Sequence, residues 1–361
     1  MPVQLPVRNP IELPKVDGPT ANAHKSIVDS IPLKLVLFLA APYLAGQTAQ
    51  GAVNRAHQLY RESRFTATID ILGEDCTADS DCDAFVKAYL QVIDLVAANQ
   101  LPTQRPEEQM TISFKPSMFS VCLPTAQVPE RDRYLAEAFG RMQKVVAYAK
   151  ERNVKMTLEA EDHNWTDFHL DTYFALINAG FTNLGTVIQS RLFRTKQDLK
   201  RFDERCRVRM VIGIYNEPAE IAHTEKPIMK ELLVDYAAEL AACGTYLEIA
   251  THDTDCVAQF FQRVAIPQQL PSNKFEIQML LGVPRKDVQQ GLVSGRYFND
   301  MAQNATSKAA DYLSDLARTG VPVRMYLPFG KDKVAGPYCK RRLKANPNMA
   351  LYGIKNLLHL R

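Results

Sequence analysis

The chain has 361 residues, of which 46% are hydrophobic and 23% charged, and its formal net charge at pH 7 is +3. This length predicts one to three domains, and the apolar content excludes a generally disordered chain. The small net charge gives no indication of a nucleic-acid-binding protein. The longest apolar run, Leu35 to Ala41, is too short for a transmembrane helix.

Seven cysteines are scattered along the chain and never form a CxxC pair. Scattered cysteines in an odd number argue against a disulfide framework and against a thiolate zinc site. The first 31 residues hold one arginine and several acidic residues, which does not fit a transit peptide. The sequence therefore predicts a cytoplasmic protein with reduced thiols.

The first 45 residues are predicted to form a separate arm. Prolines at positions 2, 6, 10, 14 and 19 remove backbone donors and oppose both helix and central strand. Residues 1–31 are predicted to be an extended arm on the body of the protein, or a tail without a role. The run from Leu35 to Ala41 is predicted to be a short helix, which either packs on the body or contacts a membrane surface beside Lys34. Residues 46–361 are predicted to form the main domain.

From residue 45 onward, helical patterns such as Gln50–Ser63 and Arg131–Glu151 alternate with short runs rich in β-branched or aliphatic residues. The predicted strands are Thr66–Leu72, Met110–Phe114, Lys155–Leu158, Leu184–Ile188, Arg207–Ile212, Tyr246–Ala250, Phe275–Leu280 and Val321–Leu327. Near-continuous apolar strands alternating with helices predict a parallel sheet that is covered on both faces. Eight such units favour a closed (β/α)8 barrel, with an open doubly wound sheet as the alternative.

Polar residues follow or end seven of the eight predicted strands, at the end of the barrel that carries active sites in this fold. They are Glu74, Lys115, Glu159, Gln189, His252, Gln278 and Tyr326. The fifth strand also carries Arg207 and Arg209 on one face by the two-residue period. An arginine inside an apolar strand requires an anionic partner.

The segment from Tyr338 to Pro347 carries a further local signal. On a helix, Tyr338 lies on the same face as Arg341 and Arg342, three and four residues later. Paired guanidinium groups bind a carboxylate in bidentate geometry. The alternative is a solvated basic helix end.

Several segments in order along the chain resemble the proline dehydrogenase family, flavin-dependent enzymes of proline catabolism. They are Thr68–Glu74, Val187–Arg191, Arg209–Tyr215, Ile249–His252, Phe275–Leu280 and Tyr338–Leu343. The resemblance extends over most of the chain after residue 45. It implies a monofunctional, FAD-dependent (β/α)8 barrel whose last helix lies over the C-terminal mouth, preceded by an extended N-terminal arm.

The resemblance also implies roles for individual residues. Lys115, Arg341 and Arg342 match the residues that bind the substrate carboxylate, and Tyr215, Tyr326 and Tyr338 match the tyrosines around the substrate ring. Glu74 matches a gate carboxylate that pairs with Arg341. Glu159 and Arg209 match catalytic positions, the latter beside the flavin.

The flavin-binding positions follow from the same resemblance. They match Ala160, Gln189, Arg209, Val211, Ile212, Gly213, Ile214, Thr251 and His252, with Thr224 and Lys226 beside the cofactor phosphates. Gly213 fits because a side chain there would obstruct a flat ring system. Lys226 has a solvent-facing lysine as its alternative interpretation.

The implied reaction is hydride transfer from C5 of L-proline to flavin N5. It gives 1-pyrroline-5-carboxylate, and the electrons then pass to a quinone, which makes peripheral contact with the membrane a further expectation. Because the substrate nitrogen must be neutral, the rate is expected to rise with pH in the alkaline range.

Two residues depart from the family pattern. Glu159 and Ala345 stand where family members usually carry aspartate and glutamate. The departures leave open a proline analogue such as hydroxyproline as substrate, or a low-activity or non-catalytic paralogue. A flavin-free lyase or aldolase that uses Lys115 as a Schiff base also remains open.

No metal site is predicted, because the six-residue spacing of His163 and His169 fits no common zinc pattern. The oligomeric state is not predicted.

Overall fold

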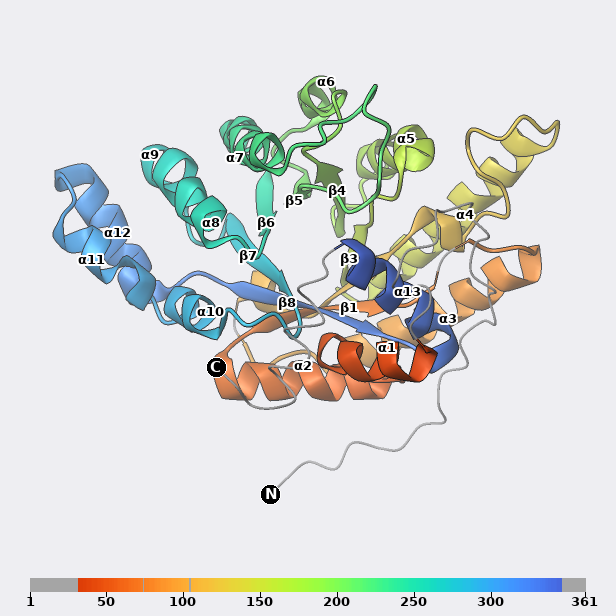
Figure 1. The fold of residues 1–361 in the computed structure, drawn as a ribbon, viewed down its shortest axis with the longest axis horizontal. Helices are drawn as coiled ribbons and strands as arrows, with labels where there is room; N and C mark the ends of the chain where they lie inside the picture. The colour runs from red at the N-terminus through yellow and green to blue at the C-terminus, as the bar shows by residue number, and fades with distance from the viewer. Residues whose placement is uncertain (1–31, 74, 104, 346–361) are drawn as a thin grey trace.

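The computed structural model describes residues 32–73, 75–103 and 105–345, which form a closed barrel of eight parallel strands in chain order. The barrel lies at the centre of the molecule and helices surround it (Figure 1). The strands are β1 (Thr66–Ile71), β2 (Thr111–Phe114), β3 (Lys155–Leu158), β4 (Leu184–Gln189), β5 (Arg207–Val211), β6 (Tyr246–Ala250), β7 (Phe275–Leu280) and β8 (Val323–Phe329). The closure of β8 onto β1 confirms the predicted (β/α)8 barrel and excludes the open sheet.

Helices follow the strands around the outside of the barrel. Those within the described residues are α1 (Leu33–Ala40), α2 (Ala49–Ser63), α3 (Asp79–Ala98), α4 (Arg131–Glu151), α5 (Thr166–Asn178), α6 (Thr195–Asp198), α7 (Lys226–Ala242), α8 (Thr254–Phe260), α9 (Ile266–Gln268), α10 (Lys286–Val293), α11 (Asn299–Gln303), α12 (Ser307–Thr319) and α13 (Asp332–Ala345). None of these helices combines the length and apolar character that crossing a bilayer requires.

Element boundaries agree closely with the sequence patterns, and the exceptions have local causes. Helix α4 matches its prediction at both ends, and α2 begins one residue early because the Thr48 hydroxyl caps it by accepting from the Gly51 backbone N–H. Strand β8 begins two residues later than predicted, directly after Pro322, which has no backbone N–H to donate. It extends to Phe329 because that residue still pairs with Ile71 of β1.

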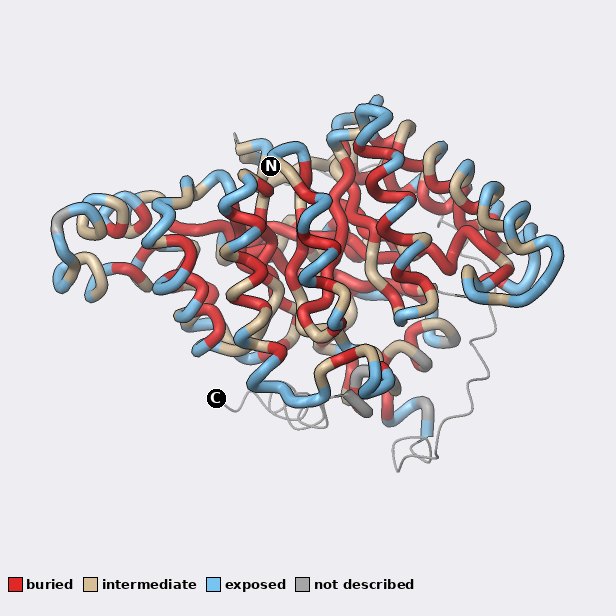
Figure 2. Tube along the Cα trace, turned by 90° about the horizontal axis from the view of Figure 1, so that it is seen from above, coloured by how far each residue is buried: buried red, intermediate tan, exposed pale blue. Residues whose placement is uncertain are grey.

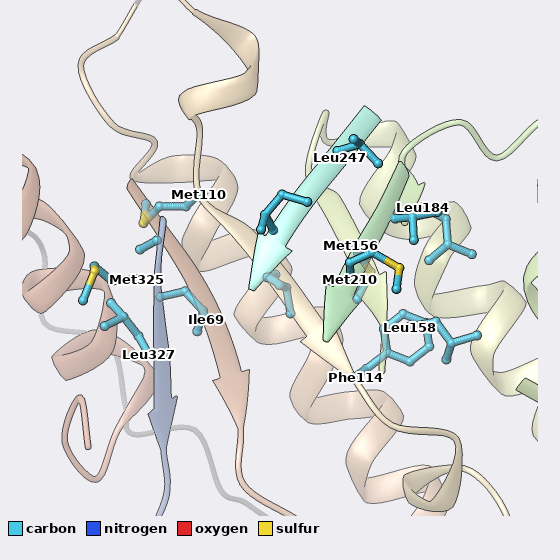
Figure 3. Close-up of a cluster of buried hydrophobic side chains, with 14 of the residues drawn as sticks. Ile69, Met110, Phe114, Met156, Leu158, Leu184, Met210, Leu247, Met325 and Leu327 are labelled. Atoms are coloured by element: carbon cyan, nitrogen blue, oxygen red, sulfur yellow. The ribbon is translucent and has the colours of Figure 1, made fainter. Parts of the chain in front are cut away.

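The outer faces of the strands form the main hydrophobic core with the surrounding helices. Alternate residues such as Ile69, Phe114, Met210 and Leu327 are fully or almost fully buried in this core, and Figure 3 shows them as part of one apolar cluster. The buried strands run through the centre of the molecule and the exposed positions lie on the surrounding helices and loops (Figure 2). The two-residue period therefore places the other face of each strand inside the barrel.

The inside of the barrel is polar, which differs from the predicted near-continuous apolar strands. A (β/α)8 barrel usually fills its interior with branched apolar side chains. Here Arg324 of β8 binds the Glu276 carboxylate of β7 through Nε at 2.6 Å and Nη2 at 2.9 Å. Arg207 of β5 donates to Glu248 of β6 nearby. Buried charges of opposite sign thus replace apolar packing in the amino-terminal half of the barrel.

Helices α1 and α13, at the two ends of the described chain, pack side by side (Figure 1). Val36 and Ala40 of α1 join Cys339 and Leu343 of α13 in a second, smaller hydrophobic cluster. The other face of α1 exposes Leu35 and Phe38. The predicted short helix is therefore present and packs on the body, with apolar side chains left on its outer face. The predicted arm, residues 1–31, lies outside the described residues.

Candidate active site

Polar and charged side chains at or just after the carboxyl ends of β2, β3, β5 and β8 come together. Lys115 directly follows β2 and Glu159 directly follows β3, whereas Arg209 lies within β5 and Tyr326 within β8. The Arg209 Nη1 atom donates to the Glu159 carboxylate at 2.5 Å, and its guanidinium lies 5.4 Å from the centre of the Tyr326 ring. These contacts cross the barrel and bring Glu159, Arg209 and Tyr326 together at its mouth.

Arg209 is the most deeply buried cation of this group, at 4% exposure. Burial disfavours a charged guanidinium, but the carboxylates of Glu159 and Glu248 outweigh this and raise the pKa of Arg209 above its usual value. Its Nε lies 3.4 Å from Glu248. Its Nη2 atom is buried without a hydrogen-bond partner among the described residues. Arg209 therefore remains charged and has a donor left for a ligand.

Lys115 lies beside a carboxylate that the sequence interpretation did not include. The Lys115 ammonium is 3.4 Å from Oδ1 of Asp70, a fully buried residue of β1. The Ser113 hydroxyl is 3.0 Å from the same oxygen and 3.3 Å from the hydroxyl of Tyr326. Burial and the negative charges of Asp70 and Glu159 raise the pKa of Tyr326, which keeps its phenol neutral.

The carboxyl ends of β3 and β4 are joined by backbone and side-chain hydrogen bonds. The Gln189 Nε2 donates to the backbone oxygen of Glu161 at 2.9 Å. The Glu161 carboxylate in turn accepts from the Ser117 backbone N–H at 2.9 Å and from the Ser117 hydroxyl at 2.6 Å. Gln189 and Ala160, which precedes Glu161, thus lie at the barrel mouth, and their assignment to flavin binding stays a prediction.

Gly213 follows β5 with a φ of +93°, a conformation that side-chain-bearing residues rarely adopt. A Cβ there would lie 2.4 Å from the Gln189 Oε1 and 2.8 Å from the Arg191 Cδ. Glycine is therefore needed by the backbone and by these neighbouring side chains, a stronger reason than the predicted approach of a flat ring. Arg191 also donates to the Tyr215 backbone oxygen, which ties the loop after β5 to the end of β4.

The chain after β6 is fixed through His252. Its Nε2 accepts from the Leu280 backbone N–H at 3.2 Å, and its backbone oxygen accepts from the Arg285 Nε at 3.1 Å. The Thr251 hydroxyl accepts from the Asp253 backbone N–H at 3.1 Å. Both residues predicted to bind flavin thus lie at the carboxyl end of β6.

Two further predicted positions precede or begin helix α7. Thr224 and Lys226 are exposed, and Lys226 is the first residue of this 17-residue helix. A helix N-terminus carries unpaired backbone N–H groups and a partial positive charge, which favour a phosphate group. Ile214 is exposed on the loop that precedes them.

Tyr338 lies on α13, the helix that follows β8, and is half-buried against the smaller hydrophobic cluster. Its hydroxyl is close enough to Tyr326 to add to the electrostatic cause of that residue's raised pKa. Arg341 and Arg342 belong to the same helix, as predicted. Their side chains and the predicted gate residue, Glu74, lie outside the described part of the structure.

The histidines considered and rejected as metal ligands have other partners. The His163 Nδ1 lies 2.6 Å from the Glu217 carboxylate. The His169 Nε2 lies 2.7 Å from the Thr186 hydroxyl and 3.3 Å from the Leu158 backbone oxygen. Within the described residues no group of three potential metal ligands comes together.

The sequence model for proline dehydrogenase matches residues 52–350 of this chain. The chain belongs to the proline dehydrogenase family. It is 26% identical to proline dehydrogenase of Deinococcus radiodurans over 340 residues, which cover 93% of this chain and 95% of the relative. It is 27% identical to proline dehydrogenase 1 of Bacillus subtilis over 320 residues, which cover 88% and 90%. The chain is thus an oxidoreductase of this family.

Solved structures show the same fold within longer proteins. Proline utilization A from Bdellovibrio bacteriovorus, inactivated by N-propargylglycine, matches 86% of this chain with a TM-score of 0.70 and 19% identity. A variant of proline utilization A from Bradyrhizobium japonicum matches 87% with a TM-score of 0.66 and 20% identity. This chain spans about a third of each of those proteins, 32% and 31%.

Sequence reasoning in this proline dehydrogenase family member missed Asp70, Ser113, Glu161, Arg191 and Glu248. The signal that was present is the two-residue period, which places Asp70 on one face of β1 and Glu248 on one face of β6. A charged residue in an otherwise apolar strand indicates an inward-facing position with a partner. The sequence interpretation applied this rule to strand five alone.

Proposed function

We propose that the chain binds FAD at the carboxyl ends of β3 to β6 and oxidises L-proline to 1-pyrroline-5-carboxylate. Residues 46–361 form the FAD-binding barrel domain in this proposal. The observation that carries it is the buried Nη2 atom of Arg209, which has no hydrogen-bond partner within the described part of the chain. A fixed guanidinium with a free donor at a barrel mouth suits a cofactor that gains negative charge when reduced.

The predicted cofactor positions have the donor chemistry that a flavin dinucleotide requires. Gln189 ends β4, the backbone around Gly213 follows β5, and His252 follows β6. The N-terminus of α7, with Lys226 and Thr224, suits the diphosphate. The residues present therefore fit FAD, which would supply the hydride acceptor.

The substrate carboxylate is assigned to Lys115, Arg341 and Arg342. The Lys115 Nζ lies 3.4 Å from the Asp70 carboxylate, and its side chain is 12% exposed at the site. Its ion pair also supports a carboxylate-binding role over a Schiff base, which requires a neutral amine. The apolar ring of the substrate is assigned to Tyr215, Tyr326 and Tyr338, since aromatic faces pack well on a small ring.

The protein contributes orientation and charge, because hydride loss from C5 leaves a positive charge at the substrate nitrogen. Glu159 and Arg209 are the catalytic residues of the proposal. The Glu159 carboxylate, held by Arg209, lies at the mouth of the barrel, where it stabilises that developing charge. The substrate nitrogen must be neutral, so kcat/KM is expected to rise about tenfold per pH unit below the pKa of the amine, which is about 10 for an aliphatic amine.

The experiment is to purify the protein, record its visible spectrum and add proline without oxygen. A flavin absorbance that bleaches supports the proposal, and a colourless protein that FAD does not reconstitute refutes it.

Lys115→Met is expected to raise the KM for proline about tenfold to hundredfold, because hydrogen bonds to charged groups contribute about 1.5–3 kcal/mol. Lys308→Met, on the exposed face of α12, is the matched control and leaves KM unchanged.

The departures at Glu159 and Ala345 support a second candidate, a proline analogue such as hydroxyproline as substrate or a low-activity paralogue. Glu159 keeps the negative charge of the family aspartate and reaches Arg209, which favours a competent site. Restoring the family pattern with Glu159→Asp and Ala345→Glu tests this candidate. If the double variant turns over proline much faster than the parent, the parent is adapted to another substrate or to low activity.

A quinone acceptor and cytoplasmic location, with peripheral membrane contact, complete the proposal. Helix α1 exposes the apolar side chains of Leu35 and Phe38 on the face that does not pack against α13, and such side chains can insert into a membrane interface, which supports this contact. Sedimentation of the protein with lipid vesicles, compared with the variant Leu35→Ser and Phe38→Ser, tests it. Equal sedimentation of both proteins contradicts the assignment.

A further inference from the structure

Asp70 is a carboxylate that the reaction as proposed does not use. It lies in β1, facing the inside of the barrel, and has no exposed surface. Its Oδ1 atom is the one beside the Lys115 ammonium and the Ser113 hydroxyl, and its Oδ2 atom has no hydrogen-bond partner among the described residues. Burial raises the pKa of the Asp70 carboxyl, although Lys115 opposes this effect. A fully buried carboxylate with one oxygen that lacks a hydrogen bond costs stability, which indicates a role other than stability.

The exposure of its neighbours indicates what that role is. Lys115 is 12% exposed and reaches the mouth, and Tyr326 is half-buried there. Asp70 and Ser113 are both completely buried beneath them. Asp70 is therefore too deep to contact a substrate, but it contacts Lys115 directly, and it interacts with Tyr326 both through the Ser113 hydroxyl and directly.

We propose that Asp70 is a positioning residue, which holds the Lys115 ammonium and, through Ser113, the Tyr326 hydroxyl in the geometry that binds the substrate carboxylate and ring. The inference rests on the proposed function, because it assigns Lys115 to the carboxylate.

The physical reason is the flexibility of lysine. Lysine carries a point charge on a four-carbon stem with many rotamers, so an unanchored ammonium is poorly placed for a bound anion. An anchor that is present before binding lowers the cost of ordering the side chain. Asp70 also partly neutralises Lys115, an effect that would weaken anion binding. Loss of positioning by Asp70 would therefore raise KM, whereas loss of the charge neutralisation would lower it. The direction of the change in KM distinguishes the two effects.

Asp70→Asn is the first variant, because it keeps the shape and the acceptor for Ser113 but removes the charge. Positioning predicts a KM for proline raised about tenfold with kcat changed less than about twofold. A lower KM would mean that neutralisation of Lys115 dominates, and it would overturn the inference. An unchanged KM would overturn it as well.

A double-mutant cycle tests whether Asp70 acts through Lys115. In the Lys115→Met background, Asp70→Asn is expected to change KM less than about twofold, because the side chain that it positions is gone. Effects of the two substitutions that multiply would refute the inference. The thermal midpoint provides the independent readout: Lys115→Met leaves Asp70 unpaired, so adding Asp70→Asn is expected to raise the midpoint.

Ser113→Ala is the second variant, and it tests the inference if the Asp70→Asn protein does not fold. It removes the hydroxyl between Asp70 and Tyr326 but leaves the ion pair with Lys115, and we expect KM to rise about twofold to fivefold. An unchanged KM would remove Tyr326 from the inference. Measurements on the parent protein distinguish a failure of the proposed function from a failure of the positioning role. If proline does not bleach the flavin of the parent, the proposed function fails, whereas a parent that bleaches with an Asp70→Asn variant of unchanged KM refutes the positioning role alone.

Discussion

Replacing Arg324 with methionine is expected to destabilise the barrel by about 4 kcal/mol at neutral pH. Arg324 and Glu276 form a bidentate ion pair inside the barrel, with side chains 2% and 1% exposed. The Arg324 guanidinium also donates to the backbone oxygens of Ala67 at 3.0 Å and Gln109 at 2.8 Å. Methionine fills much of the same volume but leaves the Glu276 carboxylate buried without its cation.

The expected loss of about 4 kcal/mol follows from the cost of protonating the buried Glu276 carboxylate. An unpaired buried carboxylate takes up a proton, and doing so at pH 7 from an ordinary glutamate pKa of about 4.3 costs about 3.7 kcal/mol. A carboxyl group that is protonated in the folded variant but ionised in the unfolded chain costs more stability the higher the pH, so the penalty declines as the pH falls towards the range in which an unfolded glutamate is protonated. The loss of stability should narrow by about 1.4 kcal/mol per pH unit, to about 1 kcal/mol at pH 5.

Urea denaturation at pH 7 and pH 5 measures this difference. The double variant Arg324→Met with Glu276→Gln should recover most of the loss at pH 7, because position 276 then carries no charge that lacks its partner. Arg133→Met is the matched control, since its partner Glu137 is exposed, and it should cost under about 0.5 kcal/mol. A loss for Arg324→Met that is equal at both pH values would refute the electrostatic reasoning and leave packing as the cause.

Two further predictions concern single buried groups. Burial lowers the pKa of His169 from 6.5 to about 4, so its neutral form stabilises the fold above pH 6.5, and roughly 3 kcal/mol is lost as the pH falls to 4. The free energy of unfolding of His169→Gln, measured by urea denaturation, should lack that pH dependence. Thr186→Val removes the hydrogen bond between Thr186 and His169 but keeps the buried imidazole, so its free energy of unfolding should still depend on pH. Gly213→Ala should reduce the FAD content of the purified protein, measured by absorbance, because the positive φ is strained and the new Cβ displaces the Gln189 carboxamide. Full FAD content in Gly213→Ala would contradict the expectation that a Cβ at position 213 displaces the Gln189 carboxamide from the cofactor.

The sequence patterns predicted the barrel well because each element carries its own signal. Strand runs such as Tyr246–Ala250 and Phe275–Leu280 match the structure at both ends. The polar residue after an apolar run, as at Lys115 and Glu159, marks the end of a strand because the barrel mouth is where charged groups reach solvent. Such signals need only local sequence.

The contacts between strands could not be predicted in the same way. Arg209 of β5 meets Glu159, which directly follows β3 two strands away, and Tyr326 of β8 meets Ser113 of β2 across β1. Neither pair has a sequence spacing that identifies it, because the distance between the side chains depends on barrel closure and register. Asp70 was missed for this reason, although its place on the inner face of β1 follows from the two-residue period.

The sequence by itself determined the order of strands and helices, the resemblance to one family, and which polar residues lie at strand ends. Only the tertiary structure decided that the inside of the barrel is charged and that Asp70 lies beneath Lys115. It also decided that Arg209 has two carboxylate partners and, among the residues that the structure describes, a donor without a partner. Local patterns record which residues are apolar and at what period. The partners of a buried charge depend on which strands close onto each other, and that is a property of the whole fold.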